Sequence, residues 1–351
     1  MKEMIIQARK ALHQLLSQVS IIKIENLEQN VAEATDAADL LAHIKTAKTA
    51  HTLVCEVLPN GQPRHVRNAL LQLHEHVAYK KNSIPVLVAP YLSPAARAMC
   101  RDKQVGFLDL QGNARIAFDG VFIERQVTDK PTTEHRALKS LFKPKSARLL
   151  RAMLREPEKA WRVTELVEAT GVSLGHVSNV RTALLDREWA RTTSAGLYLS
   201  APDELLDAWS SGYEAPLGER KRFYSPLHGS LLEDAARRAF SQDLKGHGCF
   251  SSFSASNWIA PYARVGTLHF YADHQGLEVL KEALQLTPVT KGDNIVITLP
   301  KDKALLFDTV EPSPGVLCTD PIQTYLDLSI AGERGQEAAH YLRQEKFRWT
   351  H

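Results

Sequence analysis

Two short segments separated by a glycine, at residues 163–180, constrain the fold of this chain more than any other feature. In the first segment, Leu166 and Val167 are placed to face a hydrophobic core. Gly171 follows, where a left-handed backbone can turn the chain sharply, and Ser173 can cap the next helix. Apolar residues recur at helical spacing in that second helix, at Leu174, Val177, Leu184 and Leu185. This pattern is typical of a helix-turn-helix.

The opposite face of the second helix, at residues 174–188, is polar. Short or basic side chains on such a face reach base edges or phosphates when the helix lies in a major groove. Together with Ser173, the expected DNA-binding residues here are Gly175, His176, Ser178, Asn179, Arg181 and Thr182. A three-helix domain used for packing or dimerisation is the alternative interpretation, because helix-turn-helix folds also serve that purpose.

The flanking segments complete a winged helix-turn-helix domain, which we expect at residues 136–202. Residues 146–154 have apolar positions at helical spacing and predict a first helix. Downstream, residues 190–193 and 197–199 flank a polar Ser-Ala-Gly tip and predict the small hairpin that a wing requires. Arg191 lies in the first strand of this hairpin, where it could contact the DNA backbone.

Positive charge is concentrated in the same region. Residues 130–191 contain 13 Lys and Arg against 7 Asp and Glu, a net charge of +6, whereas the whole chain carries only +3. A local basic excess in a nearly neutral protein is typical of a DNA-binding module, although a solvated helix face has the same composition. The expected phosphate contacts are Lys143, Lys145, Arg148 and Arg191.

The first 127 residues predict an α/β domain. A helix at 4–20 is followed by three strand-like segments, and then by alternating helices and strands up to a strand at 106–110. Ser93 and Pro94 are typical of a helix start. The polar residues 128–134, which include Pro131, are interpreted as a linker.

Two acidic residues lie on successive predicted strands of this domain. Asp39 and Glu56 are 17 residues apart, as in nucleases of the PD-(D/E)xK type, in which two such acids bind a divalent metal. Those enzymes place a lysine two residues after the second acid, but this chain has Leu58 there, and leucine cannot stabilise the developing charge. An endonuclease-like fold kept as a scaffold is therefore favoured, with no catalytic residue or metal. An active metal-dependent nuclease that uses Asp39 and Glu56 is the alternative.

Basic residues also lie on or after the predicted helix at 64–79. Arg64, Arg67, Lys80 and Lys81 suggest an accessory contact with DNA beside the main site. A partner surface and a solvated helix face are the alternatives.

Residues 203–351 predict a further, mixed α/β domain. Helix-like and strand-like segments alternate, with helices at 229–241 and 276–285 and strands at 264–271 and 295–299. The Ser-rich run at 250–258 is expected to form a turn and cap a helix, or else to line a polar pocket. Residues 312–315 predict a loop. The fold class is thus α+β and multidomain.

The remaining sequence features argue against several classes of protein. The chain has neither a phosphate-binding glycine loop nor a run of ~18 apolar residues, so we expect no nucleotide cofactor and no membrane span. Its four cysteines lie far apart and form no metal-ligand pairs, which is typical of free thiols in a reducing cytoplasm. We expect a cytoplasmic protein without a cofactor.

Several blocks of the sequence resemble one family, the AbiEi-type antitoxins and transcriptional regulators of type IV toxin–antitoxin systems. The blocks lie at 61–64, 85–97, 105–116, 320–328 and 335–339, and the most specific part is Pro90–Ile116. The resemblance implies a winged-helix DNA-binding module and repression of the protein's own operon. It also implies neutralisation of a nucleotidyltransferase toxin, without obligatory contact. In many relatives, the strand that ends here at Leu58 ends in Glu-Val-Lys. The replacement of this lysine by Leu58 puts nuclease activity in doubt but does not affect the expected regulatory role.

The expected partner is therefore double-stranded DNA, as the operator of the protein's own operon. We expect a homodimer, because one winged helix reads only a short site and a two-fold operator doubles the contacts.

Overall fold

The computed structural model describes residues 1–29, 38–47, 49–78, 80–127, 131–242, 246–262, 266–347 and 349. The chain forms two compact units. The first comprises residues 1–137 with 179–191, and the second comprises 138–178 with 192–351. The boundary between the units thus falls inside helix α7 (Leu174–Asp186). We describe each unit separately, and the division into three domains at 1–127, 136–202 and 203–351 stays a prediction.

The first unit contains a seven-stranded sheet with the strands in chain order. Strands β1 to β3 form an antiparallel meander, β4 and β5 continue parallel to β3, and β6 and β7 are again antiparallel. The strands are β1 (Lys23–Gln29), β2 (Leu40–Lys45), β3 (Ala50–Val57), β4 (Ser83–Ala89), β5 (Gly106–Asp109), β6 (Ala114–Phe118) and β7 (Val121–Arg125). The helices of this part are α1 (Lys2–Ser17), α2 (Pro63–Val77), α3 (Pro94–Asp102) and the first residues of α4 (Thr132–Leu141).

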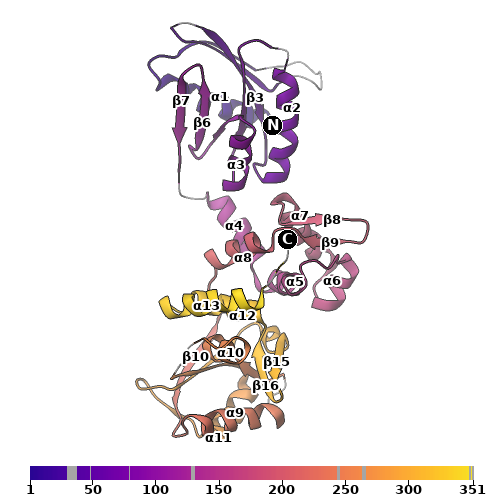
Figure 1. Ribbon diagram of the computed structural model, residues 1–351, viewed down its shortest axis with the longest axis vertical. Coiled ribbons are helices and arrows are strands. Elements are labelled where there is room, and N and C mark those ends of the chain that lie inside the picture. Colours follow the sequence, from indigo (N-terminus) through magenta and orange to yellow (C-terminus); the bar gives the residue numbers. More distant parts are fainter. Residues whose placement is uncertain are drawn as a thin grey trace. The chain divides into compact units, whose positions relative to one another are not determined.

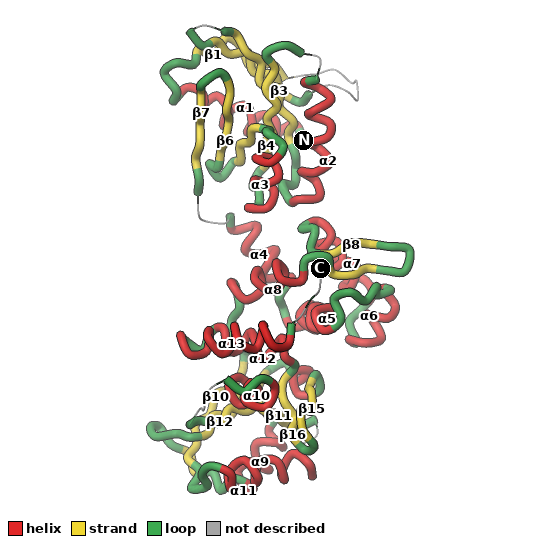
Figure 2. The backbone as a smooth tube through the Cα atoms, viewed as in Figure 1, coloured by secondary structure: helices red, strands yellow, loops and turns green. Residues whose placement is uncertain are grey.

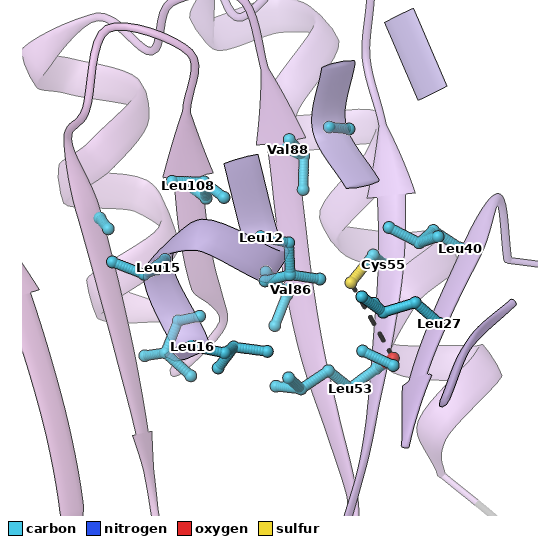
Figure 3. Packing of buried hydrophobic residues seen from close by; sticks show 14 of the residues in the cluster. Leu12, Leu15, Leu16, Leu27, Leu40, Leu53, Cys55, Val86, Val88 and Leu108 are labelled. Carbon is cyan, nitrogen blue, oxygen red and sulfur yellow. Dashed lines mark hydrogen bonds between the residues drawn. The ribbon is translucent and has the colours of Figure 1, made fainter. Parts of the chain in front are cut away.

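Helices cover both faces of this sheet, α1 on one side and α2 with α3 on the other (Figure 1). Side chains alternate between the two faces along the strands, since Cys55 packs with α1 whereas its neighbour Val54 packs with α2. Figure 3 shows the α1 side, where Leu12 and Leu16 lie against the strands. Burial on both faces explains why β4 and the middle of β3, at Leu53–Cys55, are apolar.

A buried aspartate stabilises the turn after β5. The carboxylate of Asp109 accepts hydrogen bonds from the backbone of Leu92, Gln111 and Asn113 and from the Asn113 side chain, at 2.9–3.2 Å. Asn113 in turn accepts a hydrogen bond from Arg97 at 2.6 Å. The block at 90–116 therefore has a structural role that is visible in its contacts.

The second unit begins with short helices and a hairpin. The helices are the end of α4, α5 (Pro144–Arg155), α6 (Val163–Thr170), the start of α7, and α8 (Pro202–Ser211). The hairpin consists of β8 (Ala190–Thr192), whose first two residues belong to the first unit, and β9 (Leu197–Leu199). The apolar face of α5 is buried, with Leu149, Leu150 and Met153 each at most 1% exposed. The first helix and the hairpin predicted from the sequence are confirmed as elements.

A second seven-stranded sheet follows, with the order β13-β10-β14-β12-β11-β16-β15. Helices α9 and α11 lie on one side of it, and α10, α12 and α13 on the other (Figure 2). The strands are β10 (Gly218–Tyr224), β11 (Gly248–Phe250), β12 (Leu268–Ala272), β13 (Thr287–Pro288), β14 (Ile295–Pro300), β15 (Thr309–Ser313) and β16 (Val316–Thr319). The helices are α9 (Ser230–Gln242), α10 (Ser252–Ile259), α11 (His274–Ala283), the short η1 (Lys303–Leu306), α12 (Pro321–Ser329) and α13 (Glu333–Lys346).

The mixed α/β class predicted from the sequence is confirmed, with local corrections. The linker prediction was wrong at its end, because α4 already begins at Thr132, and residues 128–130 lie outside the described residues. The predicted loop at 312–315 was wrong for its first half, because Ser313 still pairs with Val316 in the hairpin β15–β16. The predicted strand at 264–271 begins only at Leu268, and its first two residues lie outside the described part of the chain.

Two further predictions concern cysteines and membranes. Cys55, Cys100, Cys249 and Cys318 are free and buried, as expected. Among the described residues, every helix is too short or too polar to cross a bilayer.

Candidate nucleic-acid interface

The turn predicted between two helices is present. Helix α6 ends at Gly171, whose φ of +66° is the left-handed conformation that glycine adopts without strain. Helix α7 starts at Leu174, and the carbonyl of Ser173 accepts hydrogen bonds from the backbone of His176 and Val177 at 3.0 Å. Local sequence therefore determines where both helices begin and end.

The apolar face of this helix pair is partly buried, and Val167 and Leu185 are half-buried. Leu166, Val177 and Leu184 are at most 2% exposed, as predicted. Leu174 was predicted to hold α7 against the core, but it is 59% exposed, so that prediction was wrong. The reason is its place in the first turn, because side chains tilt toward the N-terminus of their helix and the side chain of Leu174 points past its end.

The polar face of α7 is accessible over most of its length. The residues that are exposed here are Ser173, Gly175, Ser178, Asn179 and Thr182. Arg181 is half-buried. His176 is also half-buried, and its Nε2 lies 2.9 Å from the hydroxyl of Ser146 on α5. His176 therefore links two helices, whereas the smaller side chains leave the outer face of α7 open.

The hairpin β8–β9 has the polar tip expected of a wing. Thr193 donates a backbone hydrogen bond to Gly196 at 2.8 Å, which closes the turn. A side chain at Gly196 would meet the carbonyl oxygen of Trp161 at 2.5 Å, so glycine is required there. Arg191 is exposed on β8.

The basic residues of α5 divide into two groups. Lys143 and Lys145 are exposed at the start of the helix. Arg148, in contrast, donates a hydrogen bond to Asp302 at 2.6 Å and is half-buried. The two lysines are thus available to phosphates, whereas Arg148 is already paired with a carboxylate.

Arg148 belongs to a row of three arginines that the sequence interpretation did not recognise. Arg151 donates to Asp308 at 2.6 Å and is 2% exposed, and Arg155 lies 2.8 Å from the other oxygen of Asp308. Arg155 also lies 3.3 Å from Asp320, the N-cap of α12. Spacings of three and four residues were the available signal, because they place all three arginines on one face of α5.

A second buried polar group lies beside this row. Asp327 accepts hydrogen bonds from the hydroxyls of Tyr213 and Tyr271 at 2.6 and 2.9 Å, and from the side chain of Gln323. Burial raises the pKa of Asp327 to about 6, and these donors oppose the shift. Because the donors lie within the protein, the cluster fixes the position of α12.

The carboxylates of the possible nuclease lie in the first unit. The backbone of Val57 donates to Asp39 at 2.8 Å. Burial, with a smaller contribution from the negative charge of Asp39, raises the pKa of Glu56 to about 7. Leu58 packs against the core on the α2 side. Among the described residues, no three His, Cys, Asp or Glu side chains are grouped so that they could hold a metal ion.

The basic residues of α2 differ in their contacts. Arg67 makes two hydrogen bonds to Glu188, at 2.6 and 2.7 Å, within the first unit. Arg64, Lys80 and Lys81 are exposed. Arg67 is therefore engaged by a carboxylate, which leaves the other three for the accessory contact predicted from the sequence.

Comparison with known proteins concerns the C-terminal part of the chain. A family described as "Transcriptional regulator, AbiEi antitoxin, Type IV TA system" matches residues 198–348. No curated protein matches the sequence. The block at 90–116, which carried the most specific part of the resemblance, lies outside the matched residues. Residues 198–348 are thus similar to the AbiEi antitoxin family of transcriptional regulators, the family that the sequence blocks also resemble.

Proposed function

We propose that this protein is a sequence-specific DNA-binding regulator, in which α7 reads base edges and the hairpin β8–β9 acts as a wing. The observation that supports this most is the open outer face of α7. Ser178 and Asn179 are exposed beside Gly175, and such small polar side chains suit the close approach of a groove to a helix. Arg181 and Thr182 are further proposed DNA-binding residues of α7, and Ser173 lies just before the helix.

Exposed basic residues outside α7 would supply the phosphate contacts. Lys143 and Lys145 are exposed at the start of α5, and Arg191 is exposed in the hairpin. Arg148 would contribute less, since releasing it from Asp302 leaves a partly buried carboxylate without its cation. His176 would act by positioning α7 through Ser146.

The family match supports a regulatory role, and we extend it to repression of the protein's own operon as an antitoxin. The proposed partners are an operator with two-fold symmetry, bound by a homodimer, and a cognate nucleotidyltransferase toxin without obligatory contact. We propose a non-catalytic scaffold for the first sheet, because Leu58 contributes to the core where a nuclease needs a lysine. Plasmid cleavage with Mg²⁺ or Mn²⁺ that is lost in Glu56→Ala would contradict this.

Fluorescence anisotropy with the full chain tests DNA binding. We expect the DNA upstream of its own gene to bind ~1,000-fold more tightly than a scrambled sequence at physiological salt. Asn179→Ala should cost about tenfold on the specific DNA only. Lys145→Ala should weaken both DNAs and reduce the slope against salt by about one.

Lys291→Ala, an exposed lysine outside the interface, is the matched control and should bind both DNAs like the wild type. Equal affinity of the wild type for both DNAs would reject sequence-specific binding. Light scattering of the complex gives the number of chains per operator.

A further inference from the structure

A cavity of about 370 Å³ lies in the second unit, next to the arginine row of α5. Its walls come from the C-terminal end of α4, the first half of α5, and α8 with the segment after it. The segment between β14 and η1 also contributes. This volume falls in the range of sites that hold small organic molecules.

Most of the wall is apolar. Phe142 and Trp209 stack with parallel rings, their centroids 5.6 Å apart, and both line the cavity. Ala147 and Leu305 are buried residues of this wall. Leu217 also lines the cavity, but it is 74% exposed. An apolar and flat body is therefore the part of a ligand that this space would bury.

One donor atom of a buried arginine in the wall lacks an acceptor among the described residues. Arg151 is 2% exposed, and its Nε and Nη1 donate to Asp308 and Gln323. In the described part of the chain, its Nη2 is buried without a hydrogen-bond acceptor. A buried guanidinium donor without an acceptor is costly and rare in folded proteins. An oxygen acceptor would satisfy this donor, and a carboxylate oxygen makes the strongest bond to guanidinium.

The charges around the cavity also favour an anion. Lys139 is paired with Glu214, and Asp302 is paired with Arg148, so these charges offset each other. Lys143 and Lys301 add positive charge at exposed positions of the lining. Helix α5 begins there at Pro144, and the N-terminus of a helix attracts negative charge.

We propose that this cavity binds a small organic monoanion, a carboxylate on a flat apolar body, with the carboxylate held by Arg151 and the N-terminal end of α5. The ligand would lie beside the helix that also carries Lys143, Lys145 and the link to His176. Binding of the ligand would therefore alter the affinity for DNA. This consequence rests on the proposed function, whereas the binding of the ligand is independent of it.

Isothermal titration calorimetry of the full chain with 2-naphthoate, without DNA, tests the site. Its neutral isostere 2-naphthamide has the same flat body and no charge. We expect the carboxylate to bind at least tenfold more tightly than the amide. Ala215→Trp places a large ring on an exposed lining residue and should reduce the affinity tenfold or more. Lys301→Ala should reduce it about threefold.

Thr290→Trp and Lys291→Ala are the matched controls, because both residues are exposed and neither lines the cavity. Both should bind 2-naphthoate like the wild type. Arg151 is kept intact, since its loss would also break the contact with Asp308 and affect folding. Equal affinity for the acid and the amide, no binding of either, or unchanged binding in Ala215→Trp would overturn the proposal.

A second measurement separates this proposal from the function on which its regulatory consequence rests. Anisotropy with the upstream DNA is repeated at saturating 2-naphthoate, and a change of threefold or more is expected in the wild type but not in Ala215→Trp. If naphthoate binds while the protein shows no specific DNA binding, the proposed function fails and the ligand site stands.

Discussion

Partly buried carboxylates occur in both units of this protein, but their surroundings differ. In the first unit, Glu56 faces the negative charge of Asp39, and its pKa is raised to about 7. In the second unit, Asp308 accepts a hydrogen bond from the guanidinium group of Arg151 and forms an ion pair with Arg155. The same chemical group is thus opposed by a like charge in one place and matched by opposite charges in the other.

The difference shows what each carboxylate contributes. A charge that burial and a like neighbour penalise lowers stability when it ionises, and such an arrangement persists where function once required it or still does. A charge that is paired within the fold holds elements together, and removing either partner is costly. We therefore interpret Asp308 as a structural link between α5 and the C-terminal sheet, whereas the charge of Glu56 opposes folding.

The largest expected effect comes from removing the paired charge. Asp308→Asn keeps the shape but leaves the buried Arg151 without its counterion, so we expect a loss of about 3 kcal/mol in the free energy of unfolding. Urea denaturation at pH 7.5 measures this. A change below ~0.5 kcal/mol, the size expected for ordinary surface substitutions, would show that the link is not structural.

The same kind of change at Glu56 should have the opposite sign. Glu56 has its pKa raised from 4.5 to about 7 in the folded protein, so the unfolded chain releases this proton first as the pH rises. Its contribution to stability is complete below pH 4.5 and is lost as the pH rises through 7. Because Glu56 is only partly buried, we expect Glu56→Gln to stabilise the protein by about 2 kcal/mol at pH 8 and by little at pH 4.5.

Denaturation curves at these two pH values test the sign. Glu75→Gln, at an exposed glutamate of α2, is the control and should leave the pH profile unchanged. A Glu56→Gln variant that is less stable than the wild type at pH 8 would mean that the charge of Glu56 is matched by a partner after all.

The smallest effect is expected at a more exposed ion pair, and it tests whether such a pair still contributes to stability. Arg155 is 39% exposed and contacts both Asp308 and Asp320. Burial raises the pKa of Asp320 to about 6, and Arg155 opposes this shift. Arg155→Met should therefore destabilise the protein by about 1 kcal/mol, more at pH 8 than at pH 5, because Asp320 is ionised only at the higher pH.

Lys281→Met is the matched control. Lys281 lies 2.8 Å from Glu278 in an exposed pair on α11, and we expect its loss to cost about 0.3 kcal/mol or less. Equal losses in the two variants would place Arg155 among ordinary surface charges.

Features that depend on neighbouring residues could be predicted from the sequence. Gly171, Ser93 and Pro94 mark helix ends through their own backbone preferences and capping groups, and the structure confirms the helix ends at these residues. The strands at 85–89 and 295–299 were recognisable because burial on both faces requires continuous apolar residues. Strands β6 and β7 were not assigned, because their hairpin at the sheet edge alternates polar and apolar residues over only five positions each.

The candidate site was only partly predictable for the same reason. The polar face of α7 follows from helical periodicity, and most of it is exposed. The exposure of Leu174 and the contact of His176 with Ser146 depend on what packs around the helix, which spacing does not encode. Arg148 was expected at a phosphate, yet Asp302, 154 residues later, accepts its hydrogen bond.

The sequence by itself determined the positions of several helices and strands, the turn at Gly171, the small polar residues of α7 and the absence of a lysine at position 58. The tertiary structure alone decided which charges are paired, that one donor of Arg151 lacks an acceptor among the described residues, and that Glu56 lies near the negative charge of Asp39. The physical reason is range. Backbone preferences and periodicity act over a few residues, whereas the electrostatic environment of a side chain depends on groups that only folding brings together.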